Sequence, residues 1–377
     1  MQRPPLAITK IADVPGSVDT IATVINNSGE LAGLYIDSNG TGHSFIDNDE
    51  GQITTDDVPG AIITSTQAIN NRGEIVGDYY DSKGGHGFIY KGGKFTTINA
   101  PDASQTFLTG VNDRGEVAGF YDVISGRNVI EHGFVYDKGK FATIDVPGST
   151  STDVTAINNT GELAGRYTDA HSGQHGFIYD NGKLTTIDVP GAEYVTVTAI
   201  NSRGEATGFY TDNISDDHGF IYNKGKLLTF DAPGAVVTLP SGINQAGEVV
   251  GSYRTGPNGG LGFIYDKGSL TTIDVPGSIS TFANKINDNG TILGVYNDSN
   301  GNEHTFTASA TSAPNALADT FVNAAQTAVA DLLPGSHGLS MTNGSVGLGG
   351  SIAEHPVGST FSALSVELQS VIPAVQV

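Results

Sequence analysis

The chain has 377 residues, of which 40 are acidic and 18 basic, so its formal net charge is −22, and it contains no cysteine. Without cysteine there is no disulfide framework, no thiolate metal site and no cysteine nucleophile. The acidic balance argues against nucleic acid as a partner, because that binding needs a basic patch, and no apolar run reaches the roughly 18 to 20 residues of a membrane span.

The first residues, from Met1 to Ile8, lack the apolar core of a secretory signal peptide. We therefore expect any signal peptide to be absent or already removed. A short β-rich segment, Ile8 to Ile11, follows directly and precedes the first Asp-Val-Pro-Gly sequence.

A module of about 43 residues then recurs seven times, and we number its copies repeats 1 to 7 in chain order. Each copy starts with Asp-Val-Pro-Gly or a close variant, with prolines at Pro15, Pro59, Pro101, Pro147, Pro190, Pro233 and Pro276. An Ile/Val-Asn pair and a turn glycine follow, with asparagines at Asn26, Asn70, Asn112, Asn158, Asn201, Asn244 and Asn287. A Gly-x-Tyr segment and a His-Gly-Phe-like triplet complete the copy, as at His175-Gly176-Phe177.

Repeat 4 shows the local pattern of four short strands. Residues 152–157, 163–167, 177–179 and 184–187 are rich in β-formers, and Asn158 to Gly161 is a turn signal between the first two. Four antiparallel strands in this length are typical of one blade of a β-propeller. The repeats contain no useful 3.6-residue apolar period, which excludes a helical solenoid, and a β-solenoid is the second choice.

The two ends of the repeat array are complementary. Ile8 to Ile11 matches the fourth strand of repeat 4, whereas repeat 7 leaves the pattern after its third strand near Phe306. The N-terminal strand can therefore complete the last sheet and remove an exposed edge. The prediction is an all-β, seven-bladed β-propeller over residues 8–311, closed by the N-terminal strand, with the Ile/Val-Asn strands lining the axis.

The repeat resembles the HAF-repeat family of bacterial, often extracellular, proteins. The resemblance rests on His-Gly-Phe-(Ile/Val)-Tyr-x-x-Gly-Lys and Ile-Asn-x-x-Gly-Glu-x-x-Gly-x-Tyr, and it covers residues 8 to about 311. This chain departs from the family pattern by having glycine for the alanine of the family triplet, tyrosine in place of tryptophan, and Asp-Val-Pro-Gly between the copies. The resemblance implies a secreted or surface protein and carries no shared activity.

Six repeats carry a histidine two residues before the third-strand phenylalanine, and repeat 6 has Leu261 there; the histidines are His43, His86, His132, His175, His218 and His304. Strands are about 4.8 Å apart, so third-strand histidines lie roughly 15 Å from the axis and cannot share a metal ion. We expect each imidazole to tie its loop to a neighbouring carbonyl or carboxylate. The aspartate of each Asp-Val-Pro-Gly is expected to be a turn acceptor, and the recurring tyrosines to be packing residues.

The loops that begin at Asp37 and Asp298 start like calcium-binding loops but lack the distal carboxylates that hold the ion. Hairpin turns explain both loops, and a weak calcium site at either is the alternative. No other cofactor is expected.

Positions that vary among the repeats are the better candidates for an asymmetric ligand site. Near the start of the predicted axial strand, one position reads Ile21, Ser65, Phe107, Asp153, Thr196, Leu239 and Phe282. Before the tyrosine of the second strand, another reads Leu34, Asp78, Phe120, Arg166, Phe209, Ser252 and Val295. Aromatic, carboxylate and guanidinium groups at one end of a ring suit a sugar or another polar ligand, although drift of unselected surface positions also explains the variation.

The predicted ligand-binding residues are Phe107, Asp153, Arg166, Asp78, Phe282, Arg127 and Arg254, with Arg127 in the longer loop of repeat 3. Familiar nucleophile, phosphate-binding and zinc-protease motifs are absent from the sequence. If the protein is an enzyme, Asp78 and Asp153 are the candidate general acid or base, and Arg166 could grip a substrate carboxylate.

Residues 312–377 differ in composition, since they contain four acidic residues and no lysine or arginine. An apolar stripe predicts a helix over 314–333, followed by a Gly/Ser/Asn-rich stretch and an apolar end from Phe361 to Val377. We expect this extension to dock on the propeller or on another copy, and an uncleaved export signal is the alternative.

Three functions remain open at this point. The first is an extracellular or surface binding module for a carbohydrate or another polar polymer. The second is a glycoside hydrolase or polysaccharide lyase with its site at the axial mouth, and the third is a structural protein that forms homo-oligomers through residues 312–377.

Overall fold

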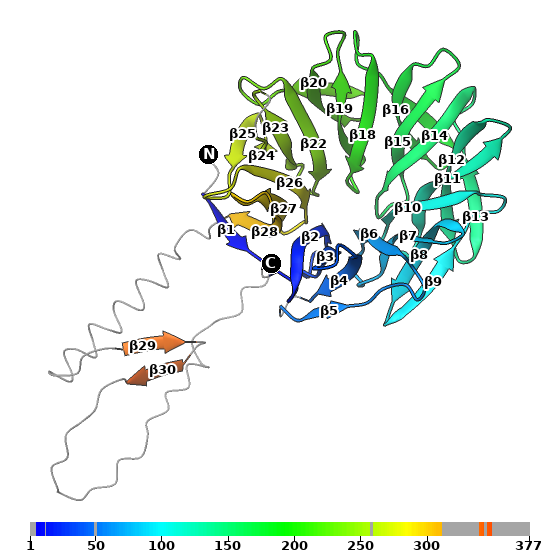
Figure 1. The fold of residues 1–377 in the computed structure, drawn as a ribbon. Helices are drawn as coiled ribbons and strands as arrows, with labels where there is room; N and C mark the ends of the chain where they lie inside the picture. The colour runs from blue at the N-terminus through cyan, green and yellow to red at the C-terminus, as the bar shows by residue number, and fades with distance from the viewer. Residues whose placement is uncertain are drawn as a thin grey trace, which may run out of the picture. The chain divides into compact units, whose positions relative to one another are not determined.

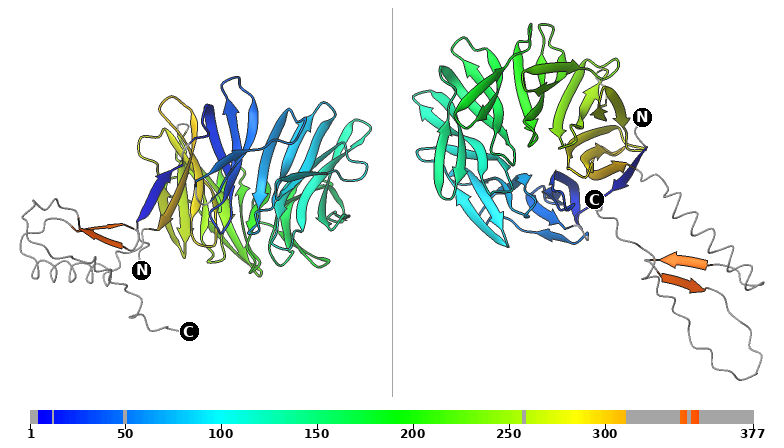
Figure 2. Two further views of the ribbon diagram at one scale, coloured as in Figure 1. Left: turned by 90° about the horizontal axis from the view of Figure 1, so that it is seen from below. Right: turned by 180° about the vertical axis from the view of Figure 1, so that it is seen from behind.

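The computed structural model describes residues 5–11, 13–48, 51–256, 259–310, 339–342 and 345–348 (Figures 1 and 2). The chain divides into two units, residues 1–311 and 312–377. All regular structure in the described part of the chain is β-strand, and no helix there is long and apolar enough to cross a membrane. The predicted helix 314–333 and the apolar end lie outside the described residues. Within the second unit, β29 (Leu339–Thr342) pairs with β30 (Ser345–Leu348) as a hairpin.

Each repeat contributes an inner strand and a second strand that pair antiparallel. The inner strands are β2 (Ser17–Ile25), β6 (Ile63–Ile69), β10 (Gln105–Val111), β14 (Ser149–Ile157), β18 (Tyr194–Ile200), β22 (Val237–Ile243) and β26 (Ser280–Ile286). The second strands are β3 (Leu31–Asp37), β7 (Ile75–Asp81), β11 (Val117–Ser125), β15 (Leu163–Asp169), β19 (Glu205–Thr211), β23 (Val249–Arg254) and β27 (Ile292–Asn297).

A third strand and an outer strand complete each four-stranded sheet. The third strands are β4 (Gly42–Asp47), β8 (Gly84–Lys91), β12 (Asn128–Asp137), β16 (Gln174–Asp180), β20 (Asp217–Asn223), β24 (Leu261–Asp266) and β28 (Glu303–Ala310). The outer strands are β5 (Ile53–Thr55), β9 (Lys94–Ile98), β13 (Lys140–Ile144), β17 (Lys183–Ile187), β21 (Lys226–Phe230), β25 (Ser269–Ile273) and β1 (Leu6–Lys10).

The four-stranded units stand around a common axis, with the inner strands facing it (Figure 1). Single parallel residue pairs, from β16 to β18 and from β20 to β22, connect the units of repeats 4, 5 and 6 into one sheet of 12 strands. Inner strands of successive repeats contact each other, and β26 contacts β2, so the ring of sheets is closed. β1 pairs with β28 in the sheet order β1-β28-β27-β26, as the N-terminal segment predicts. The four strands predicted in repeat 4 are also confirmed as β14 to β17.

The hydrophobic core lies between neighbouring sheets. The phenylalanine of each third strand is buried to 1% exposure or less: Phe45, Phe88, Phe134, Phe177, Phe220, Phe263 and Phe306. One cluster joins Ala164 and Ile178 of repeat 4 to Val195, Val197 and Phe220 of repeat 5. Because each sheet buries a face against the next one, the repeats are stable only as an array.

The asparagine of each Ile/Val-Asn pair links two neighbouring sheets. Its side-chain nitrogen donates to the backbone oxygen of the next asparagine at 2.8–3.3 Å, in the order Asn26, Asn70, Asn112, Asn158, Asn201, Asn244, Asn287 and back to Asn26. All of these asparagines are buried. The circle passes through every repeat and closes on the first.

The two faces of the ring carry different connections between strands, and we name them the turn face and the loop face. The turn face carries the Asn-x-x-Gly turns and the turns between third and outer strands. The loop face carries the Asp-Val-Pro-Gly segments and the loops between second and third strands. On the turn face, backbone N–H groups of one turn donate to side chains of the next, as Asn71 does to Asp113 and Asp113 to Asn159.

Candidate functional site

The loop face holds most of the exposed apolar side chains. Of the large hydrophobic residues exposed in the described part of the chain, Leu228 lies on an outer strand. The others lie at or beside the loop face: Val18, Ile62, Ile63, Tyr80, Ile124, Val129, Tyr194, Ile214, Val236 and Ile279. Exposed apolar groups gathered on one face indicate a binding surface. On the turn face, by contrast, polar groups of neighbouring turns hydrogen-bond to one another.

The recurring histidines are structural, which confirms their expected role. In six repeats, Nδ1 lies 2.6–3.1 Å from an oxygen of the Asp-Val-Pro-Gly aspartate or, for His86, of Asn99. The ring also packs on the tyrosine of the second strand, with centroids 4.9–5.3 Å apart. The aspartate predicted to be a turn acceptor thus holds the third strand through the imidazole.

The side chains of the loop aspartates Asp37 and Asp298 accept hydrogen bonds from backbone groups of their own hairpins. Oδ1 of Asp37 accepts the backbone N–H of Asn39 and Thr41, each at 2.8 Å, and Asp298 repeats this pattern. Their other oxygens face His43 and His304. Within the described residues, no group of three acidic or histidine side chains is placed to hold a metal ion.

The two variable positions singled out in the sequence are cross-strand partners in every repeat. In repeat 4 Asp153 lies opposite Arg166, and in repeat 3 Phe107 lies opposite Phe120. The corresponding pairs elsewhere are Ile21 with Leu34, Ser65 with Asp78, Thr196 with Phe209, Leu239 with Ser252, and Phe282 with Val295. The side chains that differ among repeats therefore occur as adjacent pairs at the loop-face end of the inner strands.

Asp153 and Arg166 form the central ion pair of the candidate site. Arg166 Nε donates to Oδ2 of Asp153 at 2.7 Å; the aspartate side chain is 5% exposed and the arginine side chain 42%. The other oxygen of the aspartate, Oδ1, is buried without a hydrogen-bond partner in the structure. Arg166 is thus engaged by Asp153, and only its remaining N–H groups are available for a ligand.

Glu131 of repeat 3 completes this arrangement from the neighbouring sheet. Burial raises the pKa of Glu131 to about 7, and a hydrogen bond with Asp153 together with the charges of Asp153 and Asp122 acts in the same direction, whereas Arg166 opposes it. A carboxyl with this pKa keeps its proton in part at neutral pH, so a potential proton donor lies beside the carboxylate of Asp153. Two carboxyl groups and a guanidinium therefore gather at this point of the loop face.

Asp122 lies directly opposite Glu131 in the β11–β12 pair. Burial and the charge of Asp153 raise the pKa of Asp122, and its buried Oδ1 is unpartnered in the structure. Phe120 precedes Asp122 by two residues and therefore lies on the same face of β11. Its ring stacks on Phe107 at 5.0 Å between centroids, so an apolar surface adjoins the acidic groups.

Asp78 extends the acidic groups into repeat 2. It is buried, and burial raises its pKa to about 6, with a hydrogen bond from Gln67 acting in the opposite direction. Tyr80 follows Asp78 by two residues on β7 and therefore lies on the same face of the strand. Burial and the charges of Asp78 and Asp122 raise the pKa of its hydroxyl. We call Asp78, Asp122, Glu131 and Asp153, together with Tyr80 and Arg166, the acidic cluster.

The remaining predicted residues do not join the acidic cluster. Phe282 belongs to repeat 7, where its ring lies so close to Gly260 that a Cβ there would be 2.5 Å from it. Arg127 is exposed at the tip of the β11–β12 hairpin, and Arg254 is exposed at the end of β23. The structure therefore brings together Asp153, Arg166 and the aromatic pair of repeat 3, with Asp78 at the margin.

Sequence reasoning missed Glu131 and Asp122. Glu131 ends the segment that makes repeat 3 longer, and its position is held by Gln174 in repeat 4 and Asp217 in repeat 5, whereas Asp122 directly precedes that segment. The unusual length of this loop was the available signal. What it could not reveal is that Glu131 meets Asp153 of the next sheet.

No known protein-family profile and no curated protein matches this sequence. Among solved structures, one from a study of two prolyl endopeptidases matches 80% of this chain with a TM-score of 0.52 at 12% identity, and this chain spans 46% of that chain's length. An Aleuria aurantia lectin mutant in complex with Fucα1-6GlcNAc matches with a TM-score of 0.41 at 12% identity, covering 77% of this chain and 91% of the lectin.

The β-propeller domain of the Trilobed protease from Pyrococcus furiosus matches with a TM-score of 0.40 at 11% identity, covering 77% of this chain and 78% of that domain. At such low identities a structural likeness concerns the fold alone. With the four-stranded sheets arranged about one axis, the class is a β-propeller.

Proposed function

We propose that the chain is a seven-bladed β-propeller of the HAF-repeat type that acts outside the cell or on its surface as a binding module. Its loop face would recognise a carbohydrate or another polar polymer through the acidic cluster of repeats 2 to 4. The observation that carries this proposal is the Asp153–Arg166 pair, in which a buried aspartate oxygen lacks a partner beside a half-exposed guanidinium.

The chemistry of the acidic cluster suits adjacent hydroxyl groups. Carboxylate oxygens accept hydrogen bonds from hydroxyls, while the free N–H groups of Arg166 donate to them. The stacked rings of Phe107 and Phe120, each partly exposed, offer an apolar surface on the same sheet. A sugar ring presents this combination of hydroxyl edges and an apolar face.

Glycoside hydrolysis or polysaccharide elimination is the alternative, favoured by the pKa of Glu131 near 7, which suits a general acid or base. However, a hydrolase needs a second carboxylate that can reach the substrate as nucleophile or base. Asp153 is 5% exposed and is held by the Arg166 guanidinium at 2.7 Å, so it is not free for that role. This geometry favours binding over hydrolysis by that pair.

A glycan array followed by calorimetry on the hits tests the proposal. Arg166→Met should weaken binding about 10- to 100-fold, because a charge-assisted hydrogen bond contributes roughly 1.5–3 kcal/mol. Arg203→Met is the matched control, since Arg203 also pairs with a carboxylate at similar exposure but lies on the turn face, and it should bind normally.

Binding that is unchanged in Arg166→Met, or the absence of any glycan ligand, would refute the site. Product analysis on the same hits separates the alternatives. Cleaved or unsaturated products that disappear in Glu131→Gln would replace the binding module with an enzyme.

A further inference from the structure

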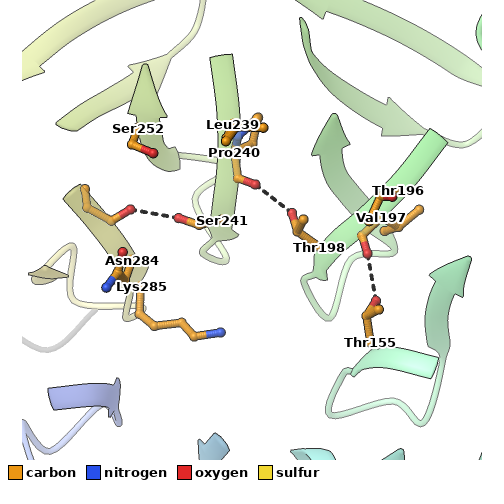
Figure 3. Close-up of a pocket in the computed structure, with 11 residues that line it drawn as sticks. Thr155, Thr196, Val197, Thr198, Leu239, Pro240, Ser241, Ser252, Asn284 and Lys285 are labelled. Carbon is orange, nitrogen blue, oxygen red and sulfur yellow. Dashed lines mark hydrogen bonds between the residues drawn. The ribbon is translucent and has the colours of Figure 1, made fainter. Parts of the chain in front are cut away.

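A second site lies on the axis, away from the acidic cluster. A cavity of about 400 Å³ is bounded by inner strands β14, β18, β22 and β26, with Thr155, Thr198, Ser241, Asn284 and Lys285 among its lining residues (Figure 3). A second cavity of about 180 Å³ also touches Thr155, Thr198 and Lys285. A volume of this size lies within the range of small-molecule sites.

Lys285 is the only basic residue of the inner strands. Lys285 lies two residues before Asn287, the recurring asparagine of repeat 7. The corresponding positions of the other repeats hold small apolar residues: Val24, Ala68, Gly110, Ala156, Ala199 and Gly242. These small residues leave room near the axis, and the Lys285 side chain extends into the space between the inner strands (Figure 3).

The ammonium group of Lys285 has no hydrogen bond or ion pair with any residue that the structure describes. Burial lowers the pKa of Lys285, and no carboxylate opposes this effect. The other charged residues of the inner strands are Asp19 and Asp153, which lie toward the loop face, and Asp153 is engaged by Arg166. An unpaired cation on the wall of a cavity favours an anionic ligand.

The hydroxyl groups of the cavity wall determine which hydrogen-bonding groups the rest of the ligand must carry. A β-bulge in each inner strand displaces one residue, and in β14, β18 and β22 this residue is Thr155, Thr198 or Ser241. Each hydroxyl donates to a backbone oxygen of the next repeat, namely those of Val197, Pro240 and Ala283, at 2.7–2.9 Å. With their protons committed, these oxygens can only accept hydrogen bonds from a ligand.

We propose that the axial cavity binds a small organic acid that also carries hydroxyl groups, such as a free uronic acid. Its carboxylate would pair with Lys285, and its hydroxyls would donate to the oxygens of Thr155, Thr198 and Ser241. Asn284 supplies both an amide donor and an acceptor at the same level. This site is independent of the acidic cluster, because it uses other residues and other repeats.

Calorimetric titration of the full chain with D-glucuronate tests the assignment, with glucose, acetate and phosphate as comparison ligands. Glucuronate should bind at least tenfold more tightly than any of the three. Lys285→Met should weaken glucuronate binding at least tenfold while keeping the fold, since it replaces an unpaired cation by an apolar side chain of similar length. Lys94→Met, at an exposed lysine of outer strand β9, is the matched control.

Thr198→Val provides a second variant of nearly the same shape, and it should weaken glucuronate binding but leave acetate binding unchanged. Arg166→Met should retain glucuronate binding, which separates this site from the one on the loop face. Equal binding of glucuronate, acetate and phosphate would mean an adventitious ion only. That result, or unchanged glucuronate binding in Lys285→Met, would overturn the proposal.

Discussion

At the scale of single residues, one buried asparagine per repeat serves two sheets. Asn158 accepts the backbone N–H of Thr160 and Glu162 through Oδ1, and it donates from Nδ2 to Glu162 and to the backbone of Asn201. Aspartate could form the same turn but has no N–H to donate to the next repeat. The recurrence of asparagine is therefore explained by the contact between repeats as well as by the turn.

Asn158→Ala should lower the free energy of unfolding by about 2 to 4 kcal/mol, because several buried donors and acceptors lose their partners. Urea denaturation measures this change. Asn159→Ala is the control, since Asn159 is exposed in the same turn, and it should cost under about 1 kcal/mol. Similar losses for the two variants would contradict the role given to the buried ring.

At the scale of elements, a histidine in six of the seven third strands joins that strand to two neighbours. His175 lies between Asp188, at 2.6 Å, and Asp169, at 3.5 Å, and it stacks on Tyr167. Burial opposes protonation of His175, yet the hydrogen bonds and charges of both aspartates outweigh it and raise the pKa. The pKa of Asp169 is lowered, chiefly by backbone hydrogen bonds within its hairpin.

These shifts predict that the protein is more stable at mildly acidic than at alkaline pH. A histidine with a raised pKa stabilises the fold fully below its ordinary value of 6.5, and this contribution is lost as pH rises through the folded-state pKa. The lowered pKa of Asp169 acts at the other end, so its contribution is lost as pH falls through its folded-state value, below 3.8. Thermal unfolding between pH 5 and 9 should therefore show a falling Tm.

Replacing His43, His175 and His218 by leucine should flatten that fall, and Leu261 shows that repeat 6 already uses leucine at this position. The slope should not vanish, because Glu131 and Asp78 also have raised pKa values and lose their contribution in the same direction. An unchanged slope in the triple variant would assign the pH dependence to other groups.

At the scale of the whole molecule, two contacts close the ring, one at its periphery and one near its axis. β1 adds the outer strand to the sheet of repeat 7, and Asn287 donates to the backbone of Asn26 near the axis. Deleting residues 1–10 removes the first closure and leaves β28 as an exposed edge. We expect a lower Tm and concentration-dependent association, measured by calorimetry and light scattering, and a monomer of unchanged Tm would argue against closure by β1.

Residues 312–377 remain a predicted assembly segment. If this extension joins copies of the chain, its deletion should lower the sedimentation coefficient by more than the lost mass explains. Analytical ultracentrifugation of both forms at several concentrations measures this difference. A change that matches the lost mass alone would remove the structural and assembly hypothesis.

The sequence by itself determined the strands, their grouping by repeat and the closure by the N-terminal segment. Turn glycines, Asn-x-x-Gly signals and β-rich runs act over a few residues, and their sevenfold copying makes each local pattern visible. The varying positions Asp153 and Arg166 could also be found, because an asymmetric exception stands out against a symmetric array.

Only the tertiary structure decided which side chains at these variable positions lie next to one another. Glu131 reaches Asp153 across two sheets, and Lys285 enters a cavity formed by several inner strands. Both outcomes depend on how sheets pack side by side and on the β-bulge that turns one residue of each inner strand toward its neighbour. The local periodicity of the sequence does not reveal the distances between residues of different repeats. Which side chains form each candidate site therefore became known only from the packing of the sheets.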